Sequence, residues 1–521
     1  MGRIGRNTTP FLAAFCVLTS LLAGCATTLP SLEGWTATTA LTDTASTRLG
    51  RALADDVAAH PGKTGVHPLG KPRDAFAARA LLAAAADRSL DVQYYIWHGD
   101  PVGYLLFEAL WQAAERGVRV RLLLDDNNTG GLDPTLAALD AHPNIEVRLY
   151  NPFVQRSGRV FGYLTDFQRL NRRMHNKSFT ADNRITVVGG RNIGGEYFGV
   201  GSGVVFADLD VLAVGAAVDE VSKEFDIYWN SPSAYPAASF VGTPGPDGAE
   251  RLRARFAAAR ADPESVAYLE AVRTTPVVRD ILERKLYFEW ATARLVYDDP
   301  AKTLDTSARK DYLLFPALVQ AMGKPEKTLD LVSPYFVPGE EGTGALVALA
   351  RSGVKVRVLT NSLAASDVAA VHAGYAKRRH DLLQGGVQIF ELKPTATQEL
   401  PADRTGVGSG SSSGLHAKTF AVDRTRIFVG SFNFDLRSAL LNTEMGLVID
   451  SPLLAQAMAE GFDTGVPLAA YEVVLGPDGR SLQWIERTAA GERRYDTEPE
   501  TSFLKRLGVG TMSILPIDWL L

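Results

Sequence analysis

The sequence predicts an α/β protein with two homologous halves, each an α/β/α sandwich, that form a bilobed unit around a pseudo-twofold axis and are joined by a helical connector. Two observations predict this fold class. A strand–helix–strand pattern at residues 89–126 recurs about 240 residues later, at residues 328–360. Each copy is followed by the polar motif His-x-Lys-x4-Asp, which begins at His175 and at His416. A duplication of one α/β unit explains both repeats.

The composition is that of a globular protein and excludes the fibrous and the largely disordered classes. The 521 residues are 46% hydrophobic and 22% charged, which is enough apolar surface for more than one core. The formal net charge of −5 gives no general attraction for nucleic acid, so any binding of an anion has to be local. Two cysteines exclude a disulfide framework.

Residues 1–25 are predicted to be a lipoprotein signal peptide. Two arginines precede an apolar run at residues 11–23, which is shorter than the roughly 20 apolar residues that span a bilayer. The run ends in Leu-Ala-Gly-Cys, which resembles the bacterial lipoprotein cleavage box with Cys25 as the acylated residue. The next residue is alanine rather than aspartate, which in such lipoproteins favours the outer membrane. An ordinary signal peptide with a chance cysteine is the alternative.

The first half is predicted at residues 70–220, after an N-terminal extension at 26–69. A buried strand at 89–97 precedes an apolar-periodic helix at 105–115, and a second buried strand follows the glycine that ends this helix. Residues 144–149 supply a third strand. Their continuous apolar runs are typical of parallel strands with both faces covered.

The second half is predicted at residues 326–460 and repeats this order. A strand at 328–336 precedes a helix at 346–351, and a third strand is predicted at 387–392. A loop rich in glycine and serine, residues 406–414, ends two residues before His416.

Two regions lie outside the halves. The connector is predicted at residues 221–325, where apolar residues recur at helical spacing in 251–260 and in 277–295. A C-terminal extension at 461–521 begins with a predicted hairpin, residues 471–486, around a Gly-Pro-Asp-Gly turn.

The two motif copies continue alike, because each is followed by a pair of small residues and an asparagine. Alternate residues of a strand share one face, so each histidine is expected beside its lysine, with the aspartate at the following turn. The small pair and the asparagine amide are predicted to bind an anion through N–H groups. The candidate catalytic residues are His175, Lys177, Asp182, His416, Lys418 and Asp423, and the candidate phosphate-binding residues are Gly190, Asn192, Ser431 and Asn433.

A pair of imidazoles and a pair of ammonium groups suit the chemistry of a phosphodiester. The lysines and amides stabilise the negative charge that grows in the transition state. One neutral histidine can attack phosphorus, and the other, protonated, can hand its proton to the leaving alkoxide. No further cluster has metal-ligand spacing, so neither a metal nor another cofactor is expected. The alternative, two structural histidines, leaves the lysines and the duplication unexplained.

With both motif copies in place, the chain resembles the phospholipase D superfamily, which is defined by paired H-x-K-x4-D motifs on two α/β halves. The similarity covers about residues 70–220 and 325–450. The resemblance implies two phospholipase D-like halves that share one active site.

The resemblance also implies a role for downstream carboxylates. In this superfamily a carboxylate orients each histidine through its other ring nitrogen. By position, Glu444 matches His416 and Asp208 matches His175, with Asp210 as the alternative to Asp208. The family usually makes the N-terminal histidine the nucleophile, which implies His175 as the nucleophile and His416 as the general acid.

Within the superfamily, segments 94–97 and 189–198 most resemble the bacterial cardiolipin synthases of the C-type branch. Classical members begin with two transmembrane helices, and this sequence shows none. The resemblance implies transfer of a phosphatidyl group between phospholipids, such as phosphatidylethanolamine and phosphatidylglycerol, to form cardiolipin. The predicted anchor at Cys25 puts this chemistry on the periplasmic face of a bacterial envelope. Neither nucleic acid nor an obligate protein partner is expected.

Three alternative functions are compatible with the same motifs. Hydrolysis of a phospholipid to phosphatidic acid requires only that water replaces the acceptor lipid. A periplasmic metal-independent nuclease or phosphodiesterase would use the same motifs. A lipid-binding or scaffolding lipoprotein without catalysis leaves the intact duplicate motifs unexplained.

Residues 160–174 have two interpretations. Val160, Leu164 and Phe167 recur at helical spacing, with arginines alongside. This pattern is typical of an amphipathic element that meets lipid beside the site, and equally of a helix that packs its apolar stripe on the core.

Overall fold

The structure is a computed structural model. It describes residues 29–32, 35–200, 204–283, 285–305, 307, 309–396, 412–488 and 490–514. The predicted signal peptide with Cys25, and residues 406–411 of the predicted loop, lie outside the described residues. No helix in the described ranges has the length and apolar character needed to span a bilayer.

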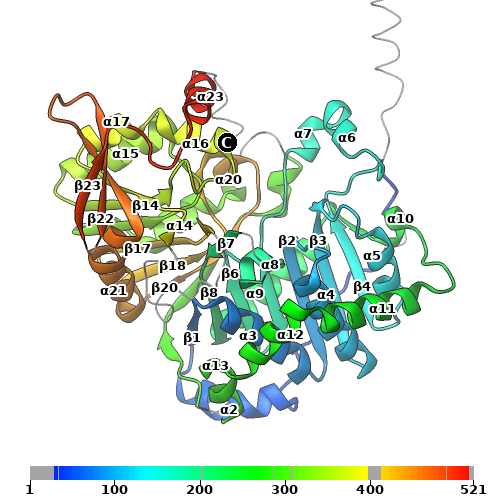
Figure 1. Cartoon of the computed structure of the whole chain (residues 1–521). Coiled ribbons are helices and arrows are strands. Elements are labelled where there is room, and N and C mark those ends of the chain that lie inside the picture. The colour runs from blue at the N-terminus through cyan, green and yellow to red at the C-terminus, as the bar shows by residue number, and fades with distance from the viewer. Residues whose placement is uncertain are drawn as a thin grey trace, which may run out of the picture.

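The chain forms two lobes, each with one large sheet and helices on its faces (Figure 1). The first sheet contains, in spatial order, β10 (Glu289–Ala291), β1 (Thr64–Leu69), β8 (Asp210–Gly215), β6 (Ile185–Gly189), β5 (Ser178–Ala181), β2 (Ser89–Ile96), β3 (Arg119–Asn128), β4 (Ile145–Tyr150) and β9 (Ala234–Pro236). The second contains β11 (Ala293–Tyr297), β20 (Met445–Ile449), β18 (Arg426–Gly430), β17 (Lys418–Val422), β12 (Thr328–Val332), β14 (Lys355–Asn361), β15 (Gln388–Leu392), β21 (Ala470–Leu475), β22 (Leu482–Thr488) and β23 (Gly491–Tyr495).

The two sheets share a core with the same topology. In the first, β2, β3 and β4 are parallel, and β5, β6 and β8 continue the sheet in antiparallel fashion. In the second, β12, β14 and β15 are parallel, and β17, β18 and β20 are antiparallel. The predicted duplicated α/β fold is therefore confirmed, and so is the C-terminal hairpin, formed by β21 and β22.

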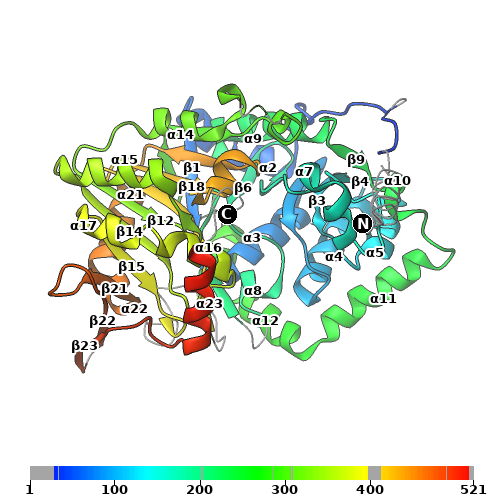
Figure 2. The ribbon, with the colours of Figure 1, turned by 90° about the horizontal axis from the view of Figure 1, so that it is seen from above.

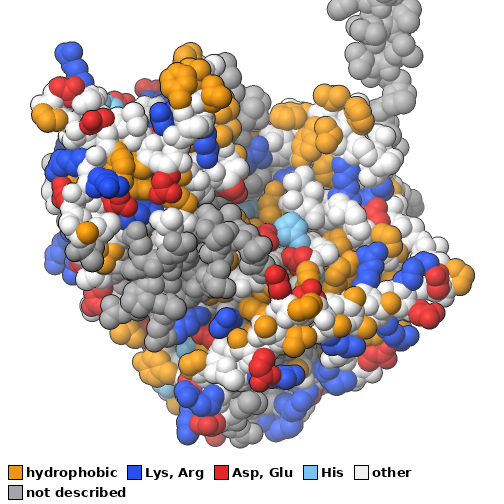
Figure 3. All heavy atoms as spheres, in the orientation of Figure 1, with side chains coloured by type: hydrophobic (Ala, Val, Ile, Leu, Met, Phe, Trp, Pro, Cys, Tyr) orange, Lys and Arg blue, Asp and Glu red, His pale blue; other side chains and the backbone are white. Residues whose placement is uncertain are grey.

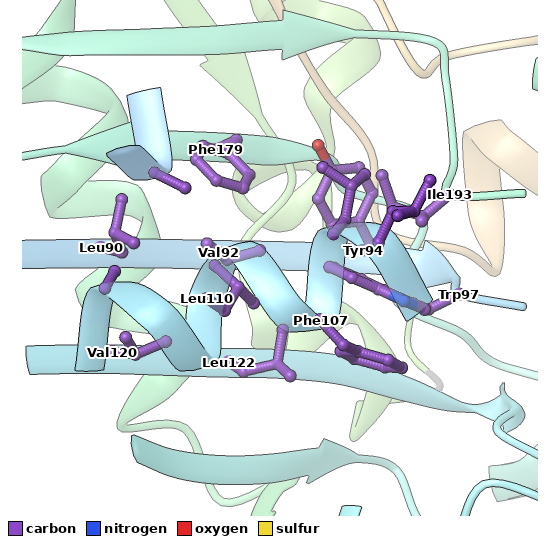
Figure 4. Close-up of a cluster of buried hydrophobic side chains, with 14 of the residues drawn as sticks. Leu90, Val92, Tyr94, Trp97, Phe107, Leu110, Val120, Leu122, Phe179 and Ile193 are labelled. Atoms are coloured by element: carbon purple, nitrogen blue, oxygen red, sulfur yellow. The ribbon is translucent and has the colours of Figure 1, made fainter. Parts of the chain in front are cut away.

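Helix α4 (Pro101–Glu115) shows how sequence positions one layer of the first half. Asp100 caps its first turn by accepting a hydrogen bond from the amide of Gly103 at 2.8 Å, and Gly117, with a φ of 89°, ends it. Phe107 and Leu110 point from this helix onto strands β2 and β3 (Figure 4). Each such buried side chain contributes about 1.5–3 kcal/mol through removal of apolar surface from water.

Other helices cover the sheets on both sides, as Figures 1 and 2 show. In the first half they are α2 (Arg48–Ala59), α3 (Pro72–Ala85), α5 (Asp133–Asp140), α8 (Gly195–Phe198) and α9 (Ala216–Trp229). In the second half they are α14 (Leu314–Met322), α15 (Gly339–Arg351), α16 (Ala369–Ala376), α17 (Arg379–Gln384), α20 (Leu436–Leu440), α21 (Pro452–Glu460), α22 (Val466–Ala469) and α23 (Phe503–Ser513).

The connector is less helical than predicted. Helices α10 (Ala238–Val241), α11 (Gly248–Ala261), α12 (Pro263–Arg273) and α13 (Pro276–Leu282) form its first part. The predicted helix at 277–295 is wrong beyond Leu282, because β10 joins the first sheet and β11 the second. Ala291, Ala293 and Leu295 are buried in the seam between the sheets. Their period of two marks strands, which the overlapping helical spacing obscured.

Two short pairings join the halves across the axis. Strand β7 (Val204–Ala207) runs parallel to β16 (Ser412–Leu415), and Met174 bridges to Thr443 in parallel register. Residues 412–415 are thus a strand, which corrects the loop predicted there. In both pairings the chain before a histidine lies beside the chain before a carboxylate of the other half, and this arrangement builds the site.

Candidate active site

His175 and His416 line one cavity of about 800 Å³ between the two lobes. Aromatic rings contact both imidazoles. The ring of Tyr95 lies 4.8 Å from that of His175, edge to face, and the ring of Tyr197 lies 5.1 Å from that of His416. Phe206 adds a second ring at 5.3 Å from His416. The walls leave each imidazole mostly buried, with one side toward the cavity.

Each histidine is held by a carboxylate of the opposite half. Nδ1 of His175 lies 2.8 Å from Oε2 of Glu444, and Nδ1 of His416 lies 2.5 Å from Oδ2 of Asp208. The predicted pairing within each half, His175 with Asp208 and His416 with Glu444, is therefore wrong, although both carboxylates belong to the site. In each pair Nδ1 is engaged, which leaves Nε2 for a substrate.

Backbone pairing explains the exchange. The amide of His175 donates to the carbonyl of Thr443 at 2.8 Å, which places the next residue, Glu444, against the imidazole. The amide of His416 donates likewise to the carbonyl of Ala207 at 2.8 Å, next to Asp208. These bonds fix the register between the halves, so neither half alone contains a complete histidine–carboxylate pair.

Asp210, the alternative partner of His175, has another role. Its carboxylate forms a buried ion pair with Arg79 at 2.8 Å and accepts a hydrogen bond from the amide of Arg191 at 3.1 Å. Asp210 therefore ties helix α3 to β8 and takes no part in holding a histidine.

The two lysines lie beneath the histidines rather than at the cavity surface. The ammonium of Lys177 donates to the carbonyl of His175, and that of Lys418 donates to the carbonyl of His416. Burial lowers the pKa of Lys418 to about 8 and that of Lys177 well below its usual range. Negative charge facing these ammonium groups, such as a phosphodiester, favours their protonated form.

The histidines are neutral in the substrate-free protein at neutral pH. Burial, with the nearby lysines, lowers the pKa of His175 well below its usual value and that of His416 to about 4. Their partners differ. Burial raises the pKa of Glu444 to about 7, whereas at Asp208 the close hydrogen-bonded contact with His416, together with nearby Lys418 and Arg191, outweighs burial and lowers the pKa. Asp208 is therefore the more firmly ionised of the two carboxylates.

The small pairs support the carboxylates instead of offering amides to an anion. The amides of Gly190 and Ser431 donate to the carbonyls of Leu209 and Met445, at 3.2 and 2.9 Å. The Ser431 hydroxyl donates to Glu444. The expectation that these two residues bind phosphate is thus corrected, because strand pairing and the histidine partner already use their polar groups.

The asparagines occupy different surroundings. Asn192 lines the cavity, where its amide nitrogen donates to Tyr197 at 3.1 Å and its oxygen accepts from the amide of Ile96 at 3.2 Å. Asn433 is buried, and its side-chain oxygen has no hydrogen-bond partner among the described residues.

Asp182 and Asp423 lie at the opposite end of the strand from the histidine of each motif. Both have positive φ, 51° and 52°, at the predicted turn between β5 and β6 and between β17 and β18. Asp182 accepts from the amides of residues 87–89, and Asp423 from those of residues 326–328. They pin the hairpin to the start of β2 or β12, so their predicted place among the catalytic residues is corrected to a structural one.

The cavity also has charged walls that the motifs did not indicate. His98 lies 3.0 Å from Glu196, and Tyr335 donates to Asp367 at 2.9 Å. Arg437 lines the cavity as well. Glu196 and Arg437 both stand four residues after the asparagine of their motif copy. Extending the repeat alignment by four residues was the signal that could have found them.

No group of three or more His, Cys, Asp or Glu side chains in the described ranges is arranged to hold a metal ion.

Comparisons with known proteins agree with this architecture. Cardiolipin synthase C of Escherichia coli is 49% identical over 474 residues, which cover 91% of this chain and all of that protein. A cardiolipin synthase of Staphylococcus aureus is 23% identical over 76% of this chain and 65% of its own length. The crystal structure of phosphatidylserine synthase of Haemophilus influenzae, 13% identical, superposes with a TM-score of 0.55 and covers 91% of this chain and all of that one, which shows a shared fold.

The family described as cardiolipin synthase, PLD-like domain, matches residues 79–229 and 318–465. The two matched segments contain both histidines and both orienting carboxylates. The chain therefore belongs to this phospholipase D-like family.

Proposed function

We propose that this protein is a phosphatidyltransferase that makes cardiolipin from two phospholipids through a phosphohistidine. The observation that carries the proposal is one cavity lined by two histidines, each with Nδ1 held by a carboxylate. Nε2 of His175 attacks the phosphorus of the donor lipid, the bond to the head-group oxygen breaks, and His416 gives its proton to that oxygen. The glycerol hydroxyl of a phosphatidylglycerol then attacks phosphorus, gives its proton to His416, and releases His175.

The unequal carboxylates support this division of roles. Firmly ionised Asp208 stabilises a cationic His416, and the bound phosphodiester adds a second negative charge that raises the pKa of His416 above its value of about 4 in the free protein. Glu444, with a pKa of about 7, is a weaker anionic partner, so His175 stays neutral and nucleophilic.

An apolar groove beside the cavity supports a lipid substrate. It has a volume of about 600 Å³, and Asp435 lines both the groove and the cavity. Phe315, Phe432 and Phe434 form much of its wall. Such a surface fits a fatty acyl chain whose phosphate lies at the histidines, whereas a nucleic acid backbone would meet one cation, Lys310, against two carboxylates, Glu341 and Asp435. The relative at 49% identity, a cardiolipin synthase C, points to the same substrate class.

We propose further that acylated Cys25 anchors the protein on the periplasmic face of the bacterial envelope, with the outer membrane favoured. The basic start, the short apolar run and the Leu-Ala-Gly-Cys box support this placement. Labelling of cells with an alkyne-bearing fatty acid should tag the protein, and Cys25→Ser should remove the tag. An untagged parent protein would reject the anchor.

The decisive assay incubates the full-length protein with vesicles of radiolabelled phosphatidylethanolamine and phosphatidylglycerol and resolves the lipid products. Cardiolipin is expected, and phosphatidic acid alone would instead identify a hydrolase. His175→Ala and His416→Ala should each lower the rate at least about 10³-fold. The matched control is His380→Ala, which changes a half-exposed histidine bonded to the carbonyl of Gly479 and should leave the rate unchanged. Full turnover by either His175→Ala or His416→Ala would reject the mechanism.

A further inference from the structure

Two apolar ridges stand exposed on the two lobes. The first, on α6 (Val160–Thr165) and α7 (Phe167–Leu170), exposes Val160, Phe161, Leu164 and Phe167 by 76, 63, 80 and 43%. The second, on α23, exposes Phe503, Leu504, Leu507 and the following Ile514 by 68, 75, 54 and 82%. The interpretation of residues 160–174 as a stripe packed on the core is therefore wrong, since these side chains face outward.

The ridges lie on the same edge of the molecule, one on each side of the hollow between the lobes (Figure 3). Figure 2, viewed from above, places α23 and α7 over different lobes. Exposed apolar side chains gathered in this way mark an interaction surface, because a water-facing surface seldom collects so many.

Each ridge is connected to a wall of the catalytic cavity. In the first lobe the hydroxyl of Tyr163 on α6 donates to Asn127 at 2.6 Å, and the amide of Asn127 donates to Tyr95, beside His175, at 3.5 Å. In the second lobe Val509 of α23 packs with Leu363 and with Ala373 of α16. Helix α16 also contributes Val371 to the cavity wall. The ridges therefore frame the cavity mouth.

Both ridges carry positive charge although the chain as a whole is acidic. Of the four arginines in residues 158–173, three form ion pairs with carboxylates, which leaves Arg172 as the free cation of the first ridge within the described ranges. Residues 503–514 contain a lysine and an arginine without any carboxylate. Arg172 donates to the carbonyl of Lys302, and Lys505 and Arg506 donate to those of Leu363 and Thr501. A backbone oxygen carries no net charge, so these hydrogen bonds do not neutralise the three cations. Their positive charge can therefore attract an external anion.

We propose that the two ridges together dock the protein on the surface of an anionic phospholipid bilayer, with the cavity mouth facing the lipids. Apolar side chains with cations beside them match the boundary between acyl chains and phosphates, whereas a protein partner would have to bridge two lobes across an open substrate path. This inference rests on the proposed function and deepens it. A lipid that leaves this bilayer for the cavity would pass between the ridges to reach His175 and His416.

The first test measures where the ridges lie. Leu164→Cys and Leu507→Cys, each made in the full-length chain, are labelled with bimane and mixed with vesicles of phosphatidylethanolamine and phosphatidylglycerol whose acyl chains carry bromine. We expect several-fold quenching at both positions and none at Val266→Cys, the control on α12, where the side chain is 52% exposed. The unsubstituted chain measures background labelling of Cys16 and Cys25. No quenching at positions 164 and 507, or equal quenching at 266, overturns the proposal.

The second test does not depend on labelling, or on the predicted acyl anchor, which all variants share. The rate with vesicle lipid is divided by the rate with a water-soluble aryl phosphodiester. The double variant Leu164→Glu/Leu507→Glu should lower this ratio about tenfold, because the carboxylates are repelled by the anionic surface and cost apolar contact. Val266→Glu should leave it unchanged, and an unchanged ratio in the double variant overturns the proposal. Quenching without any cardiolipin supports the docking surface and rejects the proposed activity, so the two failures are distinguishable.

Discussion

The two halves share one topology but hold their histidines differently. Glu444, which serves His175, accepts hydrogen bonds from the hydroxyls of Ser431 and Ser438 as well. Asp208, which serves His416, also accepts from the amide of Leu209 at 2.8 Å. The duplication thus supplied two similar frames, and different carboxylates and donors made the two imidazoles chemically unequal.

The same motif position shows the difference most directly. Ser431 donates its hydroxyl to Glu444, whereas a Cβ atom at Gly190 would lie 2.2 Å from Oδ1 of Asp208. The first half therefore needs a glycine where the second half uses a serine. The side chain of Asp208 is one methylene shorter than that of Glu444, so its carboxylate lies closer to the backbone. Only a residue without a side chain at position 190 leaves room for it.

The largest effects are expected from the two carboxylates. Asp208→Asn and Glu444→Gln should each lower kcat about 10–100-fold, because a partner that orients an imidazole is typically worth that much. The greater loss is expected for Asp208→Asn, which removes the more firmly ionised group. The measurement is kcat with vesicle lipid, and the control is Asp247→Asn on the surface, where the ion pair with Arg251 is exposed.

The crossed pairing, in which each histidine contacts a carboxylate of the other half, can be tested separately by ¹⁵N NMR of the imidazoles. Asp208→Asn should shift the Nδ1 signal of His416, and Glu444→Gln that of His175. The opposite response, His175 to Asp208→Asn, would reject the crossed pairing even if both variants lose activity.

A smaller effect is expected from reciprocal changes at the small pair. Gly190→Ser should lower kcat about tenfold, because its new side chain displaces the Asp208 carboxylate. Ser431→Gly removes the hydrogen bond to Glu444, worth about 1 kcal/mol, and the one that the hydroxyl accepts from the amide of Met445. Only the first of these acts on the partner of His175, so kcat should fall about fivefold or less. Equal losses in the two variants would contradict the steric difference between the halves, provided that both melt at the temperature of the parent protein.

The pH dependence should follow the buried lysines. Lys418, with a pKa of about 8, stabilises the transition state only when protonated, so kcat/KM should fall as pH rises, beginning no later than about pH 8. Asp208 raises the pKa of Lys418 and also that of His416, the general acid, so Asp208→Asn should move this alkaline limb to lower pH whichever of the two protons sets it. The profile is measured with the soluble diester, and Asp247→Asn serves again as control. An unmoved limb would mean that neither of these two protons sets it.

The sequence was sufficient for what local spacing encodes. The strand–helix–strand repeat and the paired motifs predicted two similar sheets and both histidines in one site, because residue identity at a fixed separation survives in the pattern. The crossed pairing was not accessible in the same way. It depends on the register of β7 with β16 and of Met174 with Thr443, contacts between segments more than 200 residues apart that no periodicity records.

Two other errors have physical reasons. The apolar positions of residues 277–295 fit a period of three or four, which predicted a helix. Ala291, Ala293 and Leu295 also fit a period of two. These residues form strands because β10 and β11 pair with the edges of the two sheets. The charged cavity walls, such as Asp367 and Arg437, come from loops and short elements whose approach to the histidines is a tertiary fact.

The smallest effect on catalysis is expected at Asp182 and Asp423, although their place in the motif predicted a catalytic role. Asp182 is fully buried and accepts three backbone amides, and Asp423 accepts three at a half-buried turn. Asp182→Ala should cost about 2–3 kcal/mol of stability because its amides lose their acceptor away from water, and Asp423→Ala about 1 kcal/mol because water can replace it. Scanning calorimetry should therefore show the larger fall in Tm for Asp182→Ala. At a temperature where both variants are folded, kcat should stay close to that of the parent protein. A large loss of kcat with an unchanged Tm would return these aspartates to the catalytic machinery.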